Sequence, residues 1–182
     1  MTIVLTGPES TAKSTLAEAV VTELTGGGAS AEGFAGKKPI LVPEYAREYV
    51  AALGRSYLPS DLLRIAVTQA THEHDAATSL NLVIADTDIQ VITIWWREKY
   101  GALPRTLIQL AQAMTDKFYL LCQPDIPWSE DPLRENPLDR DRLFNLYRDD
   151  LEQRGVRYGI VHGNGDARVQ CAINLIRDAG RG

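Results

Sequence analysis

Residues 7–14 constrain the fold most, because they read Gly-Pro-Glu-Ser-Thr-Ala-Lys-Ser. A short apolar run, Ile3-Val4-Leu5, precedes this segment, and a helical pattern from Thr15 to Val21 follows it. A glycine-led turn ending in Lys-Ser between a strand and a helix is typical of a phosphate-binding loop, in which backbone N–H groups surround a phosphate. The sequence therefore predicts an α/β protein that binds a nucleoside triphosphate at this loop.

The loop also assigns roles to its side chains. We expect Lys13 to reach the β- and γ-phosphates of ATP and the Ser14 hydroxyl to hold Mg²⁺. Ala12 departs from the motif, which has glycine there; its methyl group crowds the phosphate at a position that favours positive φ. A chance match in an ordinary turn is the alternative, and the flanking strand and helix argue against it. The predicted ATP-binding residues are Gly7, Glu9, Ser10, Thr11, Ala12, Lys13, Ser14 and Thr15.

The rest of the chain alternates apolar runs with longer helical patterns. Strands alternating with helices indicate βαβ units and a mainly parallel sheet with helices on both faces. With neither repeats nor a linker, the sequence predicts a single domain over residues 1–182, with a flexible glycine-rich loop at 26–36. Further strands are predicted at 39–42, 82–85, 118–122 and 158–161, and further helices at 45–53, 60–79, 89–100, 107–114, 139–154 and 167–179.

Composition excludes several classes of protein. A net charge of −5 argues against a broad nucleic-acid-binding surface. The sequence contains no run of about 18 apolar residues, so we expect no membrane span. It begins with neither a basic flank nor a signal core, and Cys122 and Cys171 are expected to be reduced, buried thiols. These features predict a cytoplasmic protein.

Two carboxylates follow predicted strands, where parallel sheets bind their ligands. Asp86 follows the third strand, and we expect it to steady Mg²⁺. Glu44 follows the second strand and could accept a proton from a substrate hydroxyl, or it could be a solvated turn residue. Asp88 could contact substrate and also cap the next helix. Arg47 could simply form a surface pair with Glu48.

Residues 124–142 are expected to form a lid. Four prolines between residues 123 and 137 disfavour regular structure there, and Arg134, Arg140 and Arg142 could stabilise the charge that develops during phosphoryl transfer. A solvated helix start with mixed charges is the alternative. Trp128 lies in this stretch without apolar periodicity, and we expect it to stack on a flat ring.

Taken together, these motifs resemble the nicotinamide riboside kinase domain of the NadR family, a branch of the phosphate-loop nucleoside and nucleotide kinases. The resemblance runs nearly from end to end. The motifs that carry it are the loop at 7–16, Glu44-Tyr45-x-Arg47-Glu48-Tyr49-Val50, Asp86-Thr87-Asp88, Lys99-Tyr100 and Pro127-Trp128-x-x-Asp131-x-x-Arg134. The chain departs from the family at Ala12, in the glycine-rich loop, and at Pro132, where the family usually has glycine.

The resemblance implies a three-layer fold with a five-stranded parallel sheet in the order 2-3-1-4-5 and an arginine-bearing lid. It implies ATP with Mg²⁺ as phosphoryl donor and the 5′-hydroxyl of nicotinamide riboside as acceptor. Either Glu44 or Asp86 would draw on that hydroxyl as the base. Lys13, with the lid arginines, would act on the transferring phosphate, and Ser14 and Asp86 would hold the metal. The implied substrate-binding residues are Glu44, Tyr45, Arg47, Asp86, Asp88, Trp128 and Asp131. Of these, Trp128 and Tyr45 are the candidates to hold the nicotinamide ring.

Two other functions remain compatible with the sequence. The acceptor could be another nucleoside or a nucleoside monophosphate. The protein could also be a nucleotide-binding regulator with little turnover, an alternative that Ala12 keeps open. Because Met1 lies almost at the first strand, we expect no adenylyltransferase domain ahead of the kinase, as the long family members have. The sequence does not indicate an oligomeric state.

Overall fold

The computed structural model describes residues 1–26, 34, 36–78, 80–113, 116–131 and 138–181. Its sheet has five strands, all paired in parallel, in the order β2-β3-β1-β4-β5. The predicted sheet and strand order are therefore confirmed. The strands are β1 (Thr2–Thr6), β2 (Lys38–Val42), β3 (Asn81–Asp86), β4 (Lys117–Cys122) and β5 (Arg157–Val161).

The helices lie close to their predicted positions. The largest differences are at α1, which ends four residues after the predicted end at Val21, and at α3, which ends three residues before the predicted end at residue 79, itself outside the described residues. The helices are α1 (Lys13–Thr25), α2 (Tyr45–Ala52), α3 (Pro59–Ala76), α4 (Ile89–Tyr100), α5 (Arg105–Ala113), α6 (Arg140–Arg154) and α7 (Asp166–Arg181). Most of the predicted glycine-rich loop, 27–33 and 35, and residues 132–137 of the predicted lid lie outside the described residues.

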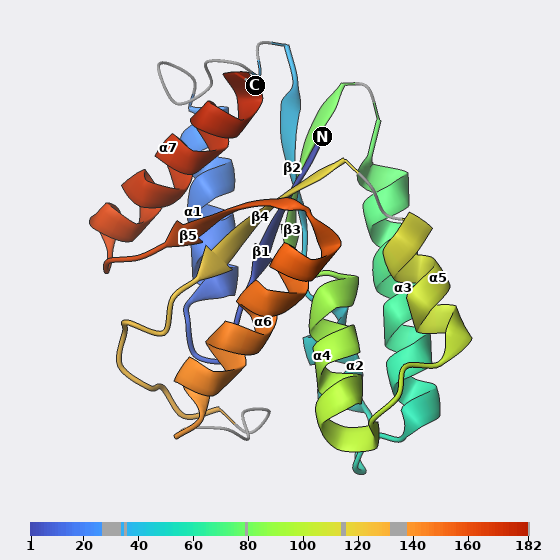
Figure 1. Ribbon diagram of the computed structural model, residues 1–182. Coiled ribbons are helices and arrows are strands. Elements are labelled where there is room, and N and C mark those ends of the chain that lie inside the picture. The colour runs from blue at the N-terminus through green and yellow to red at the C-terminus, as the bar shows by residue number, and fades with distance from the viewer. Residues whose placement is uncertain (27–33, 35, 79, 114–115, 132–137, 182) are drawn as a thin grey trace.

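Helices cover both faces of the sheet (Figure 1). Side chains alternate along each strand, so Ile3 and Leu5 pack with α1 and α7 on one face, while Val4 packs with α4 and α6 on the other. A third cluster, built around Leu62 and Leu107, joins α2, α3 and α5 to α4. The predicted three-layer architecture is confirmed, with this helical unit added beside it.

The carboxyl ends of the parallel strands share one edge of the sheet, which lies toward the bottom of Figure 1. The phosphate loop, α2 and the segment after β4 all leave the sheet there. In the described part of the chain, no helix is both long and apolar enough to cross a membrane. Both cysteines are free thiols; Cys122 is buried as predicted, whereas Cys171 is partly exposed.

Candidate functional site

The loop between β1 and α1 has an unusual backbone. Gly7 has φ +124°, and a Cβ atom there would lie 2.8 Å from the Cys122 carbonyl oxygen on the neighbouring strand. Only glycine lets the chain turn this close to β4. Ser10 and Ala12 also have positive φ, 55° and 57°, and Ala12 is the N-cap of α1. The positive φ predicted at Ala12 is therefore confirmed.

Side chains hold the carbonyl groups of this loop. Lys13 Nζ donates to Gly7 O (3.0 Å) and Pro8 O (2.7 Å), Arg140 Nη1 donates to Ser10 O (3.1 Å), and Arg168 Nη2 donates to Thr11 O (3.0 Å). A loop whose carbonyl oxygens already have protein donors can turn its N–H groups toward an anion. The dipole of α1 adds positive potential at the same place.

Asp86 ends β3 beside the loop, because the parallel register sets it opposite Leu5. The next residue, Thr87, has φ +68° and donates its backbone N–H to Leu5 O at 3.1 Å. Asp86 is buried, and its Oδ1 atom has no hydrogen-bond partner. Burial raises the pKa of Asp86, while a hydrogen bond from Ser14 and the charge of Lys13 act in the opposite direction.

The Ser14 hydroxyl and the unpartnered carboxylate oxygen of Asp86 fit Mg²⁺, which prefers oxygen ligands and keeps several waters. Among the described residues, no three His, Cys, Asp or Glu side chains gather into a group that could hold a metal ion. A magnesium ion at Ser14 and Asp86 would therefore need ligands from water and from bound phosphate.

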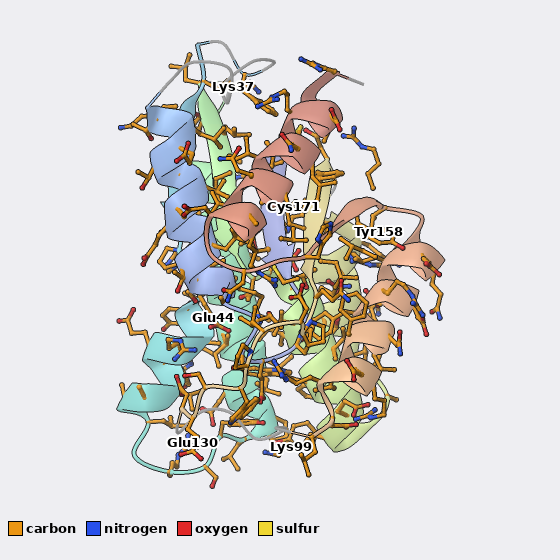
Figure 2. All side chains as sticks on the ribbon, turned by 90° about the vertical axis from the view of Figure 1, so that its left-hand side faces the viewer. Lys37, Glu44, Lys99, Glu130, Tyr158 and Cys171 are labelled. Atoms are coloured by element: carbon orange, nitrogen blue, oxygen red, sulfur yellow. The ribbon has the colours of Figure 1, made fainter. Side chains whose placement is uncertain are left out.

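Glu44 lies at the N-cap position of α2, immediately after the strand β2 and Pro43. Figure 2 shows it where the lower end of α1 meets α2. Burial raises the pKa of Glu44, the positive charge of Lys13 lowers it, and the negative charge of Asp86 raises it further. A buried carboxylate with a raised pKa, which the charges of Lys13 and Asp86 influence, is suited to accept a proton at this edge of the sheet.

The segment after β4 contacts both α2 and the phosphate loop. Arg47 Nη1 donates to Asp131 Oδ2 at 2.7 Å, and Arg47 Nε lies 3.7 Å from Glu44 Oε2. The Ser129 backbone N–H donates to Ser10 Oγ at 2.8 Å. Arg47 thus pairs with Asp131 rather than with Glu48, its alternative partner in the sequence.

The two predicted ring-binding residues lie in different surroundings. Trp128 lies near the loop, with the Arg140 guanidinium carbon 5.9 Å from its ring centroid. Tyr45 instead packs against Tyr49 and, edge-on, against His72 of α3, with centroid distances of 5.8 and 5.5 Å. Tyr45 and Tyr49 line a pocket of about 210 Å³ along α2, together with Glu48, Ala52 and Leu53.

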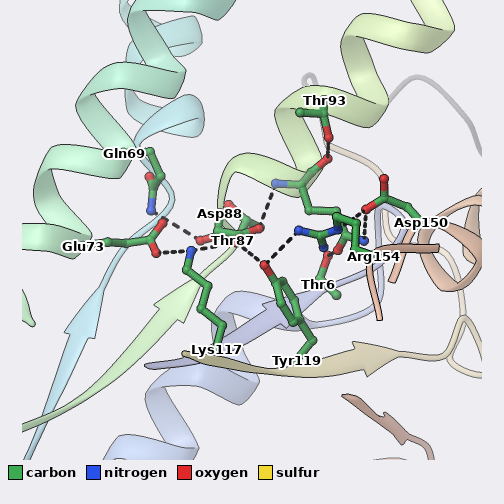
Figure 3. A network of polar contacts seen from close by, with 11 residues as sticks. Thr6, Gln69, Glu73, Thr87, Asp88, Thr93, Lys117, Tyr119, Asp150 and Arg154 are labelled. Atoms are coloured by element: carbon green, nitrogen blue, oxygen red, sulfur yellow. Dashed lines mark hydrogen bonds and ion pairs between the residues drawn. The ribbon is translucent and has the colours of Figure 1, made fainter. Parts of the chain in front are cut away.

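Asp88 caps α4 as expected, because its carboxylate accepts the Gln90 backbone N–H at 2.9 Å. The same carboxylate also accepts hydrogen bonds from Lys117 Nζ and Tyr119 Oη, both at 2.8 Å (Figure 3). Its side chain is fully buried. The structure therefore places Asp88 in a buried polar network, where its carboxylate is occupied by protein donors rather than turned toward a substrate.

The three predicted lid arginines are placed differently. Arg140 contacts the phosphate loop through the Ser10 carbonyl. Arg142 forms ion pairs with Glu98 of α4 and Asp139 at the start of α6, and half of its side chain is exposed. Arg134 lies outside the described residues.

Arg168 was missed by sequence reasoning, although it touches the phosphate loop directly. The only indication in the sequence was the position of Arg168 on the face of α7 that also carries Ala172 and Ile176, both of which are buried. Lys117, which opens the apolar strand β4 and is buried, was a similar signal. A charged side chain inside an apolar pattern indicates a buried polar contact, but not its partner.

Comparisons with known proteins fit this geometry. The sequence profile of the family described as AAA domain matches residues 2–168. The chain belongs to this family. No curated protein sequence gives a significant match.

Solved structures similar to this chain include those of two kinds of protein. Two are of NadR protein: in complex with NAD and AMP-PNP, with 17% identity and TM-score 0.66, and in complex with NR, with 19% identity and TM-score 0.68. Each covers 100% of this chain, which spans about half of the NadR chains (49% and 52%). Thymidylate kinase from Ehrlichia chaffeensis has 14% identity and TM-score 0.62, with 98% of both chains covered. The resemblance to NadR is thus confirmed at the level of the fold.

Proposed function

We propose that this protein is an ATP-dependent kinase that phosphorylates the 5′-hydroxyl of nicotinamide riboside. The observation that carries the proposal is that Glu44 and Asp86 lie at the carboxyl ends of the neighbouring strands β2 and β3, at the edge of the sheet where the phosphate loop leaves β1. This arrangement sets a candidate base beside a candidate phosphate and metal site. The similarity to a NadR protein solved with NR, which we take as nicotinamide riboside, supports this acceptor.

On the donor side, the phosphate loop binds the β- and γ-phosphates of ATP through its backbone N–H groups. Lys13 leaves the carbonyls of Gly7 and Pro8, which hold it here, and turns to the phosphates. Ser14 and Asp86 hold Mg²⁺, which supplies neutralisation of phosphate charge when bound. Arg140, already on the loop at Ser10, is the described lid arginine best placed to stabilise the transferring group.

On the acceptor side, Glu44 accepts the proton of the 5′-hydroxyl. The hydroxyl oxygen forms a bond to the γ-phosphorus while the bond to the β,γ-bridging oxygen breaks, and ADP leaves with that electron pair. Arg47 steadies the Glu44 carboxylate and links it to Asp131. Trp128 is the better candidate of the two aromatic residues to stack on the nicotinamide ring, because Tyr45 is packed against α3.

Two observations favour alternative functions. The match to a thymidylate kinase over 98% of both chains favours a nucleoside monophosphate as an alternative acceptor. Ala12 favours a regulator with slow turnover, because a residue with a Cβ atom is strained in the left-handed conformation that Ala12 adopts in the phosphate loop.

The test is ADP release from ATP and Mg²⁺ with a panel of nucleosides and nucleoside monophosphates. We expect release with nicotinamide riboside and loss of release in Lys13→Ala. Lys38→Ala is the matched control, because this exposed lysine starts β2 away from the loop. ADP release with thymidine monophosphate alone would show that the acceptor is a nucleoside monophosphate and not nicotinamide riboside. ATP binding without ADP release on any acceptor would refute the proposal that the protein is a kinase.

A further inference from the structure

Arg168 lies buried in the first turn of α7, with 3% of its surface exposed. Its guanidinium group donates four hydrogen bonds. Nη1 reaches Asp125 Oδ1 at 2.7 Å and Gly163 O at 2.9 Å, while Nη2 reaches Thr11 O at 3.0 Å and Gln123 O at 2.9 Å. One side chain therefore joins segments that lie more than 150 residues apart in the sequence.

The four acceptors belong to three loops at the carboxyl edge of the sheet: the phosphate loop after β1, the segment after β4 and the segment after β5. Asp125 strengthens the connection, because its Oδ2 accepts the Gly163 backbone N–H at 2.6 Å. A planar guanidinium holds several acceptors in a fixed geometry, which an ammonium group does not. Arg168 therefore fixes these loops relative to one another.

The strand order places this cluster on one side of the phosphate loop. β4 and β5 lie on one side of β1, whereas β3 and β2, which carry Asp86 and precede Glu44, lie on the other. A displacement of the Arg168 cluster should reach the phosphate loop without directly touching Glu44 or Arg47.

We infer that Arg168 is a positioning residue for the phosphoryl donor, acting through Thr11 and the loops after β4 and β5. It holds the Thr11 carbonyl outward, so the loop presents N–H groups to the phosphates. It also fixes the loop at Gly163 next to the segment that begins at Gln123. The inference rests on the proposed function only in naming ATP as the ligand.

The test compares Arg168→Met with the wild-type protein by the Kd of a fluorescent ATP analogue and by KM for ATP and for nicotinamide riboside. Without the hydrogen bond to Thr11 O the phosphate loop is held less firmly for ATP, so the substitution should weaken ATP binding by about tenfold or more. We expect KM for ATP to rise with Kd, and KM for the acceptor to stay within about twofold of wild type.

Two further variants separate positioning from folding. Arg168→Lys keeps the charge beside Asp125 but cannot span all four acceptors, so its Kd should lie between those of wild type and Arg168→Met. Arg157→Met is the matched control, because this exposed arginine donates to Ala179 O at the far end of α7, and its Kd should equal that of wild type. If Arg168→Met does not fold, the Kd values of Arg168→Lys and Asp125→Asn are compared with that of wild type instead.

The inference is overturned if folded Arg168→Met binds the ATP analogue as wild type does. It is also overturned if KM for the acceptor rises as much as KM for ATP, since that would indicate general loosening. Failure of the proposed function looks different. Wild-type protein would bind the analogue yet phosphorylate no acceptor, and the comparison of Kd values would still decide the role of Arg168.

Discussion

Replacement of Lys117 by methionine tests the buried polar network in Figure 3. Lys117 Nζ lies 2.6 Å from Glu73 Oε2 and 2.8 Å from Asp88 Oδ2, and the three side chains are at most 4% exposed. Burial alone would lower the pKa of Lys117, but Asp88 and Glu73 outweigh it and raise the pKa. The lysine is therefore charged, and its single positive charge is shared between two carboxyl groups that have little contact with water.

The expected loss of stability in Lys117→Met depends on the two buried carboxyl groups that remain without the lysine. Removing one partner of a buried ion pair costs about 3–5 kcal/mol, because the other charge stays buried. Asp88 keeps its hydrogen bonds from Tyr119 and from the Gln90 backbone, so it tolerates the loss best. Burial already raises the pKa of Glu73, so this carboxyl should take up a proton in the variant. We expect the free energy of unfolding to fall by about 3–5 kcal/mol, which corresponds to a Tm lower by roughly 6–20 °C.

Urea unfolding followed by circular dichroism measures this loss. Lys38→Met is the matched control, because Lys38 also begins a strand but is exposed, and it should change the free energy of unfolding by less than about 0.5 kcal/mol. Adding Glu73→Gln to Lys117→Met should recover part of the loss, since glutamine is buried uncharged without having to take up a proton. The reasoning is wrong if Lys117→Met costs no more than Lys38→Met.

Three other substitutions test the phosphate loop and its base. Burial raises the pKa of Glu44 above 4.5, so the acid limb of the pH–rate profile should lie above that value. Folded wild type then binds more protons than the unfolded chain just above pH 4.5, and its free energy of unfolding should fall as the pH rises from there, relative to Glu44→Gln. A stability difference independent of pH would contradict this shift. Gly7→Ala meets the Cys122 carbonyl at 2.8 Å, so chemical unfolding should show a loss of at least about 2 kcal/mol, against no loss in Gly26→Ala, where φ is −64°. Ala12→Gly relieves the strain of a left-handed φ of 57° but raises the conformational entropy of the unfolded chain. The free energy of unfolding should therefore stay unchanged or rise by less than about 1 kcal/mol, with a Tm equal to or slightly above that of wild type. A clear fall in Tm would argue against the left-handed conformation.

The fold could be predicted because its signals are local. The apolar strands and the helical patterns between them are repeated often enough to indicate a parallel α/β sheet, and the phosphate loop has its own motif. Because parallel strands end at one edge of a sheet, the positions of Glu44 and Asp86 after their strands were enough to predict that both lie near the loop. The left-handed conformation at Ala12 followed from the glycine that the motif normally has there.

The contacts between distant segments could not be predicted in this way. Neither spacing nor residue type shows that Arg168 bonds to Thr11, since the pairing depends on how β1, β4 and β5 align in space. The same holds for Arg142, which pairs with Glu98 of α4, and for Tyr45, which packs on α3. Asp88 was recognised as a helix cap, but its second role depends on Lys117, 29 residues further along the chain.

The central claim is that this site transfers the γ-phosphoryl group of ATP to a nucleoside with Glu44 as the base. Single-turnover transfer from γ-labelled ATP to nicotinamide riboside tests it most directly, in wild type and in Glu44→Gln. We expect the label on the 5′-oxygen of the nucleoside in wild type, and ATP binding without transfer in Glu44→Gln. Label released as inorganic phosphate whether or not the nucleoside is present, or equal transfer in both proteins, would contradict the account.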